Sequence, residues 1–108
     1  MKMAGTAKTS ADRIPTPTIG EILKEEFLDP LEITPYRLAK ELHVATSSIL
    51  DLIHDKRRLS VDMALKLSRF FGTSERFWLN LQNEIDVRNR KEELENALQS
   101  IHPVAHSA

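Results

Sequence analysis

Cysteine is absent from this 108-residue sequence, and glycine and aromatic residues are scarce. Without cysteine the chain has no disulfide framework, no thiolate zinc site and no cysteine nucleophile. Three glycines and little alternation of β-branched or aromatic residues argue against a β-rich fold. No apolar run approaches the roughly 18 residues of a membrane-spanning helix, and residues 1–11 lack the apolar segment of a secretory signal. We therefore expect a soluble, cytoplasmic protein with no membrane contact.

The net charge of -1 also lacks the strong basic excess that would by itself indicate a nucleic-acid partner. Its distribution is more informative. Residues 14–33 carry one basic and five acidic side chains, whereas residues 34–69 carry seven basic and four acidic ones. The middle third is thus the basic part of an otherwise acidic chain, although charge maps this uneven are also common in proteins that bind no polyanion.

Apolar residues recur at helical spacing in five segments within about 70 residues. The first is expected to begin with a capping box formed by Thr18 and Glu21 and to end at Asp29-Pro30. The others are predicted at 34–42, at 46–53, at 60–71 before Gly72, and from Ser74 through Ile85. A weaker pattern continues beyond residue 86.

The connection between the second and third segments is only about three residues long, at residues 43–45. Such a turn suits two helices that cross steeply, as in a helix-turn-helix. We therefore predict an all-α fold, a compact five-helix repressor-like helix-turn-helix domain over residues 14–90. A flexible arm over residues 1–13 precedes it, and a C-terminal extension over residues 91–108 is partly helical and then a flexible tail.

The segment YRLAKELHVATSSI at residues 36–49 resembles the repressor-type (XRE) helix-turn-helix family. Three further blocks resemble the HigA-type antitoxins of bacterial toxin–antitoxin modules. They are GEILKEEFLDPL at 20–31, KRRLS at 56–60 and GTSERFWLNLQ at 72–82. The resemblance covers residues 17–90, and it is strong because all blocks occur in order at matching separations.

The resemblance implies a homodimer that binds palindromic operator DNA in the major groove and represses its own operon, nucleoid-associated when so bound. It also implies a HigB-like partner, a small basic toxin that cleaves messenger RNA and is inactive in the complex. This chain departs from the family in two places. Asp55 replaces a common glycine after the third helix, and Ala45 replaces a polar N-cap, so that Thr46 is expected to cap instead.

The third predicted helix, at 46–53, would be the recognition helix of this motif, which reads bases with its N-terminal, outward-facing residues. With Ile49, Leu52 and Ile53 facing inward, His54 and the predicted base-facing residues lie outward. These base-facing residues are Thr46, Ser47, Ser48, Leu50 and Asp51. Hydroxyl groups can bond several base edges, and an acid can accept from a cytosine amino group. The alternative is that the hydroxyl cluster only caps the helix.

Phosphate contacts are expected on both sides of the recognition helix. The predicted contacts are Lys56, Arg57 and Arg58 after it, Arg37 and Lys40 before it, and backbone amides near Thr34 and Tyr36. Taken alone, the basic run would be read as a solvated charged turn. Its position behind a helix-turn-helix favours phosphate binding.

Apolar residues after the fourth segment are candidates for a dimer interface. They are Trp78, Leu81, Ile85, Leu94 and Leu98, while the aromatic group that Trp78 shares with Phe70, Phe71 and Phe77 is expected in core and interface. A two-fold dimer would place its recognition helices about 34 Å apart. The alternative is that Leu81 and Ile85 only cover the core of their own chain.

Nothing in the sequence favours catalysis, a cofactor or a metal. His102 and His106 have a spacing that could hold a metal, but Pro103 interrupts them. The acidic residues at 21, 25 and 26 are better explained as an exposed helix face. We therefore predict a non-enzyme without cofactors. Three functions remain open: an autoregulating antitoxin, a solitary transcriptional regulator without a toxin, and a protein-interaction module that has lost DNA binding.

Overall fold

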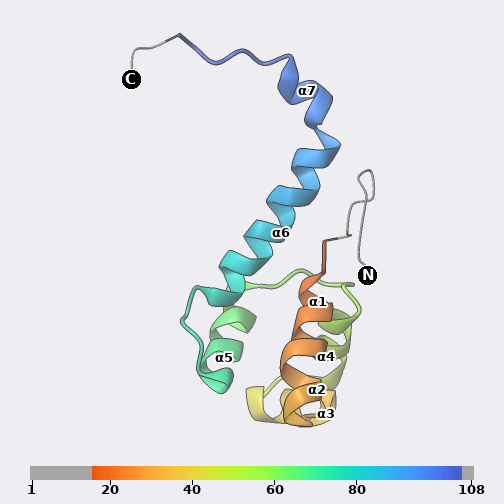
Figure 1. Ribbon diagram of the computed structural model, residues 1–108. Coiled ribbons are helices and arrows are strands. Elements are labelled where there is room, and N and C mark those ends of the chain that lie inside the picture. The colour runs from red at the N-terminus through yellow and green to blue at the C-terminus, as the bar shows by residue number, and fades with distance from the viewer. Residues whose placement is uncertain (1–15, 106–108) are drawn as a thin grey trace, which may run out of the picture.

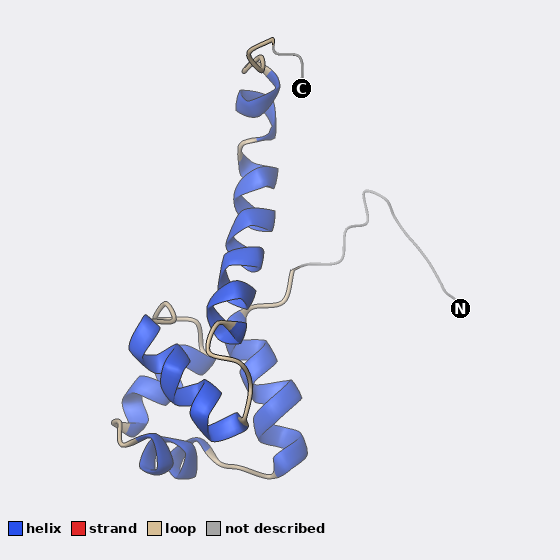
Figure 2. Ribbon diagram, turned by 90° about the vertical axis from the view of Figure 1, so that its left-hand side faces the viewer, coloured by secondary structure: helices blue, strands red, loops and turns tan. Residues whose placement is uncertain are grey.

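The computed structural model describes residues 16–105, and all regular structure in this range is helical (Figures 1 and 2). In chain order the elements are α1 (Ile19–Ile22), η1 (Leu23–Leu28), α2 (Asp29–Leu31), α3 (Pro35–Leu42), α4 (Thr46–Ile53), α5 (Val61–Phe71), α6 (Phe77–Glu93) and α7 (Glu95–Gln99). The predicted all-α architecture is confirmed. The predicted arm at 1–13 lies outside the described residues.

The elements α1, η1 and α2 form one continuous rod. The Thr18 hydroxyl accepts from the Glu21 N–H and the Glu21 carboxylate accepts from the Thr18 N–H, both at 3.0 Å, so the predicted capping box is confirmed. The predicted end at Asp29-Pro30 is wrong, because the rod continues to Leu31 and stops at Glu32, whose φ is 56°. In η1 the backbone is π-helical, and Pro30 then occupies the first turn of α2, where its missing N–H is tolerated.

Three other predicted helix boundaries are confirmed. Hydroxyl groups of Thr34 and Ser60 cap α3 and α5 by accepting from backbone N–H groups at 3.1 Å, and Gly72 ends α5 with a φ of 76°. The predicted start of the last segment at Ser74 is wrong. The Ser74 side chain makes no cap bond, and α6 begins at Phe77 after a turn, with Arg76 at the N-cap position.

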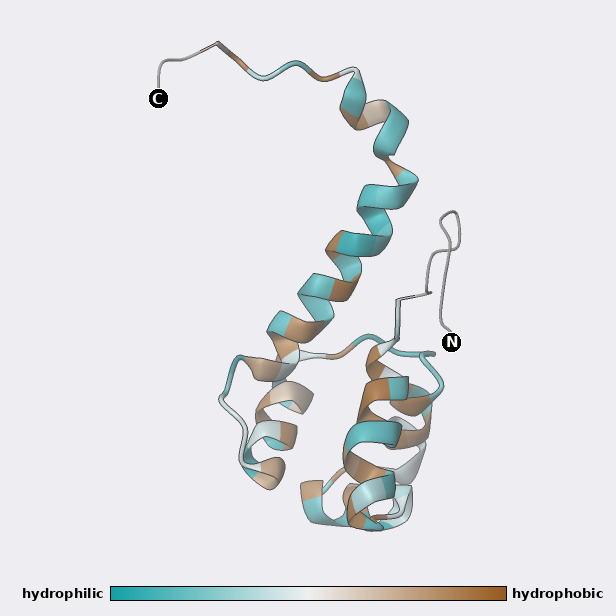
Figure 3. Cartoon of the chain, in the orientation of Figure 1, coloured by the Kyte–Doolittle hydropathy of each residue, from teal (hydrophilic) through white to brown (hydrophobic). Residues whose placement is uncertain are grey.

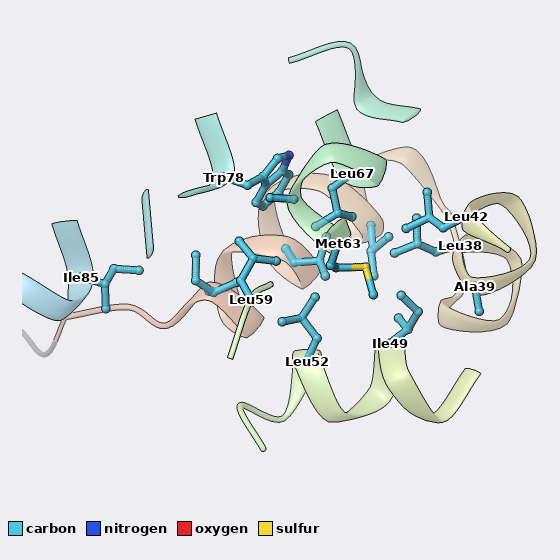
Figure 4. Close-up of a cluster of buried hydrophobic side chains, with 14 residues drawn as sticks. Leu38, Ala39, Leu42, Ile49, Leu52, Leu59, Met63, Leu67, Trp78 and Ile85 are labelled. Atoms are coloured by element: carbon cyan, nitrogen blue, oxygen red, sulfur yellow. The ribbon is translucent and has the colours of Figure 1, made fainter. Parts of the chain in front are cut away.

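A single core holds the helices together (Figure 4). Each of α1, η1, α3, α4, α5 and α6 contributes fully or nearly fully buried apolar side chains. The residues labelled in Figure 4 are Leu38, Ala39, Leu42, Ile49, Leu52, Leu59, Met63, Leu67, Trp78 and Ile85. Burial of this kind removes about 25 cal/mol of unfavourable hydration per Å² of apolar surface and drives the packing of the short helices.

An aromatic cluster joins the end of α5 to the start of α6, as predicted. The ring of Trp78 lies 5.2 Å from that of Phe77 and 6.1 Å from that of Phe71, between centroids. Phe27 of η1 also belongs to this cluster, which its position in the sequence did not indicate, and its ring lies 4.7 Å from that of Trp78 and 4.9 Å from that of Phe71. The first rod is therefore fixed to α5 and α6 through this ring.

Beyond Ile85, α6 leaves the domain, and α7 continues it (Figures 1 and 2). The helix runs unbroken through residue 90, the predicted end of the domain. Its distal part is largely hydrophilic (Figure 3). The radius of gyration is 17.9 Å, against about 13 Å for a compact domain of about 100 residues, because this extension projects from the bundle. No helix within residues 16–105 is long and apolar enough to cross a bilayer.

Candidate nucleic-acid interface

The turn between α3 and α4 is closed by local hydrogen bonds. His43 adopts the left-handed conformation with a φ of 60°, and the Val44 N–H donates to the Ala39 carbonyl at 3.0 Å. The His43 N–H also donates to the Lys40 carbonyl, at 3.3 Å. These two hydrogen bonds end α3 and redirect the chain. Because Ala39 and Leu42 of α3 are buried together with Ile49 of α4, the two short helices are held against each other by their apolar faces. The predicted helix–turn–helix at 34–53 is thus present.

The polar side chains at the N-terminal end of α4 are exposed or half-buried, and none of them is fully buried. The predicted Thr46 cap is wrong, because Ala45 holds the N-cap position without a side-chain bond and Thr46 is the first helical residue. Alanine can adopt the extended backbone of an N-cap but offers no side-chain acceptor. The hydroxyls at 46–48 are therefore not used in capping. Ser47 and Leu50 are exposed, and Thr46, Ser48 and Asp51 are half-buried.

The C-terminal end of α4 is fixed to the first rod. Asp55 has a φ of 60°, the conformation for which a glycine is common, and its carboxylate accepts from the Gly20 N–H at 3.1 Å. A Cβ built on Gly20 would lie 2.1 Å from the carbonyl oxygen of Ile53. Aspartate at residue 55 thus tolerates the turn and also satisfies an N–H in the first turn of α1, which a glycine could not do.

The predicted phosphate-binding residues are all exposed, but they differ in their hydrogen-bond and ion-pair partners. Arg37 Nε lies 3.7 Å from Oε2 of Glu41, one turn further along α3. Tyr36 is 65% exposed, and the Thr34 hydroxyl is occupied by the Arg37 N–H. Within residues 16–105, the side chains of Lys40, Lys56 and Arg57 have no carboxylate at ion-pair distance. Three cations close to α4 are thus available to an external anion.

Arg58 is different, because it is paired with α6. Its Nη2 donates to Asp86 Oδ2 at 2.6 Å, and Gln82 Nε2 donates to Asp86 Oδ1 at 3.1 Å. The hydrogen bond from Arg58 holds the pKa of the Asp86 carboxyl below its ordinary value, against the opposing effect of partial burial. The same bond raises the pKa of Arg58.

A surface hollow lies beside this ion pair, between the turn after α4, the start of α1 and the middle of α6. Its lining includes Lys56, Arg57, Arg58, Asp86 and Asn89. Sequence reasoning missed Asp86 and Gln82. They lie 28 and 24 positions beyond Arg58, and no spacing rule connects a turn to a helix that the chain reaches only after another helix.

The predicted dimer residues fall into two groups. Trp78 and Ile85 lie in the chain's own core, 0% and 7% exposed, so they are removed from the set that could meet a second copy. The physical reason is that the first half of α6 completes the domain core. Leu81 is half-buried against the same core, whereas Leu94 and Leu98 are 37% and 44% exposed on the extension.

The described residues contain no ready metal site. Within residues 16–105, no three His, Asp or Glu side chains gather closely enough to hold an ion. His102 is exposed in the segment after α7, and His106 lies outside the described residues.

Comparison with known proteins matches this geometry to one family. A family model described as helix-turn-helix matches residues 23–78. The chain is 42% identical over 69 residues to virulence-associated protein I of Dichelobacter nodosus, covering 64% of each chain. It is 38% identical over 79 residues to antitoxin HigA-1 of Vibrio cholerae, covering 70% of this chain and 74% of that one.

Among solved structures, the fold is similar to that of the Pseudomonas aeruginosa antitoxin HigA with the higBA promoter. The TM-score is 0.76 and the identity 35%, over 83% of this chain and 99% of the other. These matches confirm the prediction of a non-enzymatic helix-turn-helix protein that resembles HigA. The chain belongs to the helix-turn-helix family, with α3 and α4 as the two helices of its motif.

Proposed function

We propose that this protein is a HigA-type antitoxin that binds operator DNA as a homodimer, represses its own operon and neutralises an mRNA-cleaving toxin. One observation carries the proposal. A short helix with exposed hydroxyl and apolar side chains follows a tight turn, in a chain similar over 83% of its length to an antitoxin solved with promoter DNA. That arrangement can place the N-terminal half of α4 in a major groove.

In this proposal α4 reads bases and its flanks bind phosphate. Ser47 and Leu50 are the exposed residues among the first five of α4, and a hydroxyl and an apolar side chain can meet base edges and a thymine methyl group. Lys40, Lys56 and Arg57 would neutralise backbone phosphates, because no carboxylate of the described residues is paired with them. Asp51 would contribute discrimination at a cost in affinity.

The DNA-binding proposal is tested with two matched double variants. Ser47→Ala with Leu50→Ala should weaken binding to the chain's own promoter about 10-fold or more while leaving binding to a scrambled duplex unchanged, because base contacts carry discrimination. Lys56→Gln with Arg57→Gln should weaken both duplexes and flatten the dependence of affinity on salt by up to about two ions. Equal binding of promoter and scrambled DNA by the parent protein would contradict an operator-binding function.

The antitoxin part is tested by co-expression with the reading frame adjacent to the gene. Growth arrest by that product alone, relieved by this chain and accompanied by co-elution of the two, is the expected result. If the product is harmless and forms no complex, the antitoxin proposal is wrong. If this chain then binds its promoter, it is a solitary regulator. If it does not bind the promoter, it is a protein-interaction module.

A further inference from the structure

The three consecutive cations after α4 are not equivalent. Lys56 and Arg57 have no carboxylate partner within residues 16–105, whereas Arg58 is bonded to Asp86 at 2.6 Å. The three line the same surface hollow, so this difference does not come from position on opposite faces. It comes from a single acid on α6, the helix that also leads into the C-terminal extension.

The two side chains of the ion pair differ in exposure and in the number of their hydrogen-bond partners. The Asp86 side chain is 33% exposed and receives a second hydrogen bond from Gln82, one turn earlier on α6. The Arg58 side chain is 72% exposed, and Asp86 is its one ion-pair partner among the described residues. A guanidinium binds carboxylate and phosphate oxygens through the same N–H groups. The carboxylate is thus fixed, while the guanidinium is free to exchange one anion for another.

We propose that Asp86 competes with the DNA backbone for Arg58 and so limits the number of phosphates that each chain neutralises. The inference rests on the proposed DNA binding and identifies Asp86 as an affinity-setting residue. In the free chain the turn offers Lys56 and Arg57 to phosphate, and Arg58 joins them only by leaving Asp86. The carboxylate that remains is then an uncompensated negative charge beside the DNA, which disfavours the exchange.

The alternative is a purely structural bridge. In that case the pair would only hold the turn against α6, and its loss would alter stability without altering the number of ions released on DNA binding. The salt dependence of affinity separates these two roles, since its slope counts neutralised phosphates at about 0.9 per contact. Stability and salt slope are independent readouts.

The experiment compares the parent with Asp86→Asn, Arg58→Gln and the double variant. Asparagine keeps the size and one acceptor for Gln82 but removes the charge. Affinities are measured for a duplex of the chain's own promoter region and for a scrambled duplex, from about 50 mM to about 200 mM salt. Thermal unfolding of each variant establishes that it is folded.

We expect Asp86→Asn to bind both duplexes more tightly at low salt, with a slope steeper by about 0.9. Over a fourfold rise in salt it should therefore lose about 3.5-fold more affinity than the parent. Adding Arg58→Gln to Asp86→Asn should restore the parental slope. Arg58→Gln alone should leave the slope unchanged, because Arg58 makes no phosphate contact in the parent.

Two results would overturn the inference while leaving the proposed function intact. One is promoter binding by Asp86→Asn with the parental slope. The other is a slope flattened by about 0.9 in Arg58→Gln alone, which would place Arg58 on phosphate despite Asp86. Failure of the folded parent to bind promoter DNA would instead refute the DNA-binding function on which the inference depends.

Discussion

Gly20 allows the backbones of α1 and α4 to approach each other closely. Any side chain there would place a Cβ 2.1 Å from the Ile53 carbonyl oxygen and 2.7 Å from that of Leu52. These are backbone atoms at the end of α4, so the strain cannot be relieved by a rotamer change. Gly20 therefore helps to determine where α4 lies relative to the rest of the domain.

The substitution Gly20→Ala is expected to destabilise the protein by about 1–3 kcal/mol, because the steric cost exceeds the gain in helix propensity. Urea unfolding measures the change. Gly72→Asn is the matched control, since a Cβ at residue 72 meets nothing within 4 Å and asparagine tolerates a φ of 76°. Parental stability in Gly20→Ala would contradict the close packing of α1 on α4.

Asp55 combines a left-handed backbone with a hydrogen bond from the Gly20 N–H at 3.1 Å. Asp55→Asn should retain both features and stay within about 0.5 kcal/mol of the parent. Asp55→Ala loses the acceptor and fits the turn less well, and should cost about 1–2 kcal/mol. Chemical unfolding of both variants tests this. Equal losses would show that charge, and not hydrogen bonding, is what matters at this residue.

At the scale of elements, α6 has two roles. Its first half supplies Trp78 and Ile85 to the core, and its middle holds the turn after α4 through Asp86 and Arg58. The aromatic cluster adds a third connection, from α6 to η1 through Phe27. Helices as short as α3 and α4 have little stability of their own, so contacts of this kind decide their placement.

The Arg58–Asp86 pair predicts a pH dependence of stability. Because the folded-state pKa of Asp86 is lowered, its contribution is fully present above the pKa of the unfolded chain and is lost as pH falls through the folded value. The difference in unfolding free energy between the parent and Asp86→Asn should be constant near neutral pH and shrink between about pH 5 and about pH 2. Denaturant unfolding across that range measures it. A difference that does not shrink in acid would mean that the carboxylate's charge contributes nothing.

At the scale of the whole molecule, the extension exposes apolar side chains that the domain does not use. Leu94 and Leu98 are 37% and 44% exposed, and they are followed by Ile101 at 66%. Leu94 lies at the break between α6 and α7, Leu98 lies within α7 and Ile101 follows its end, and in a homodimer these side chains would be covered by the second copy. A two-fold dimer formed through the extension would present two α4 helices to a palindromic site.

Replacing Leu94 and Leu98 together by serine is expected to convert a dimer into single chains of 12.3 kDa. Domain stability should change by less than about 1 kcal/mol, because both side chains are already partly in water. Light scattering gives the mass. Leu31→Ser, at a 57% exposed position on α2, is the control and should stay dimeric. A dimeric double variant, or a monomeric parent, would refute this interface.

Much of the fold could be predicted because its signals are local. The caps by Thr18, Thr34 and Ser60 act within three residues, and the left-handed Gly72 follows directly from its own backbone freedom. The first and last residues of α4 were also predicted, at 46 and 53, from the helical spacing of its apolar residues. The end of the first rod did not, because the π-helical turn that accommodates Pro30 has no sequence marker.

The sequence by itself determined the helices, the short turn of the motif and the family to which the chain belongs, since each depends on neighbours along the chain. Only the tertiary structure decided which cations are free, because Arg58 meets Asp86 across 28 positions. It also removed Trp78 and Ile85 from the candidate dimer residues by burying them in the chain's own core. Burial and ion pairing arise between segments distant in sequence, and the periodicity of a single helix carries no information about which partner its apolar or charged face will meet.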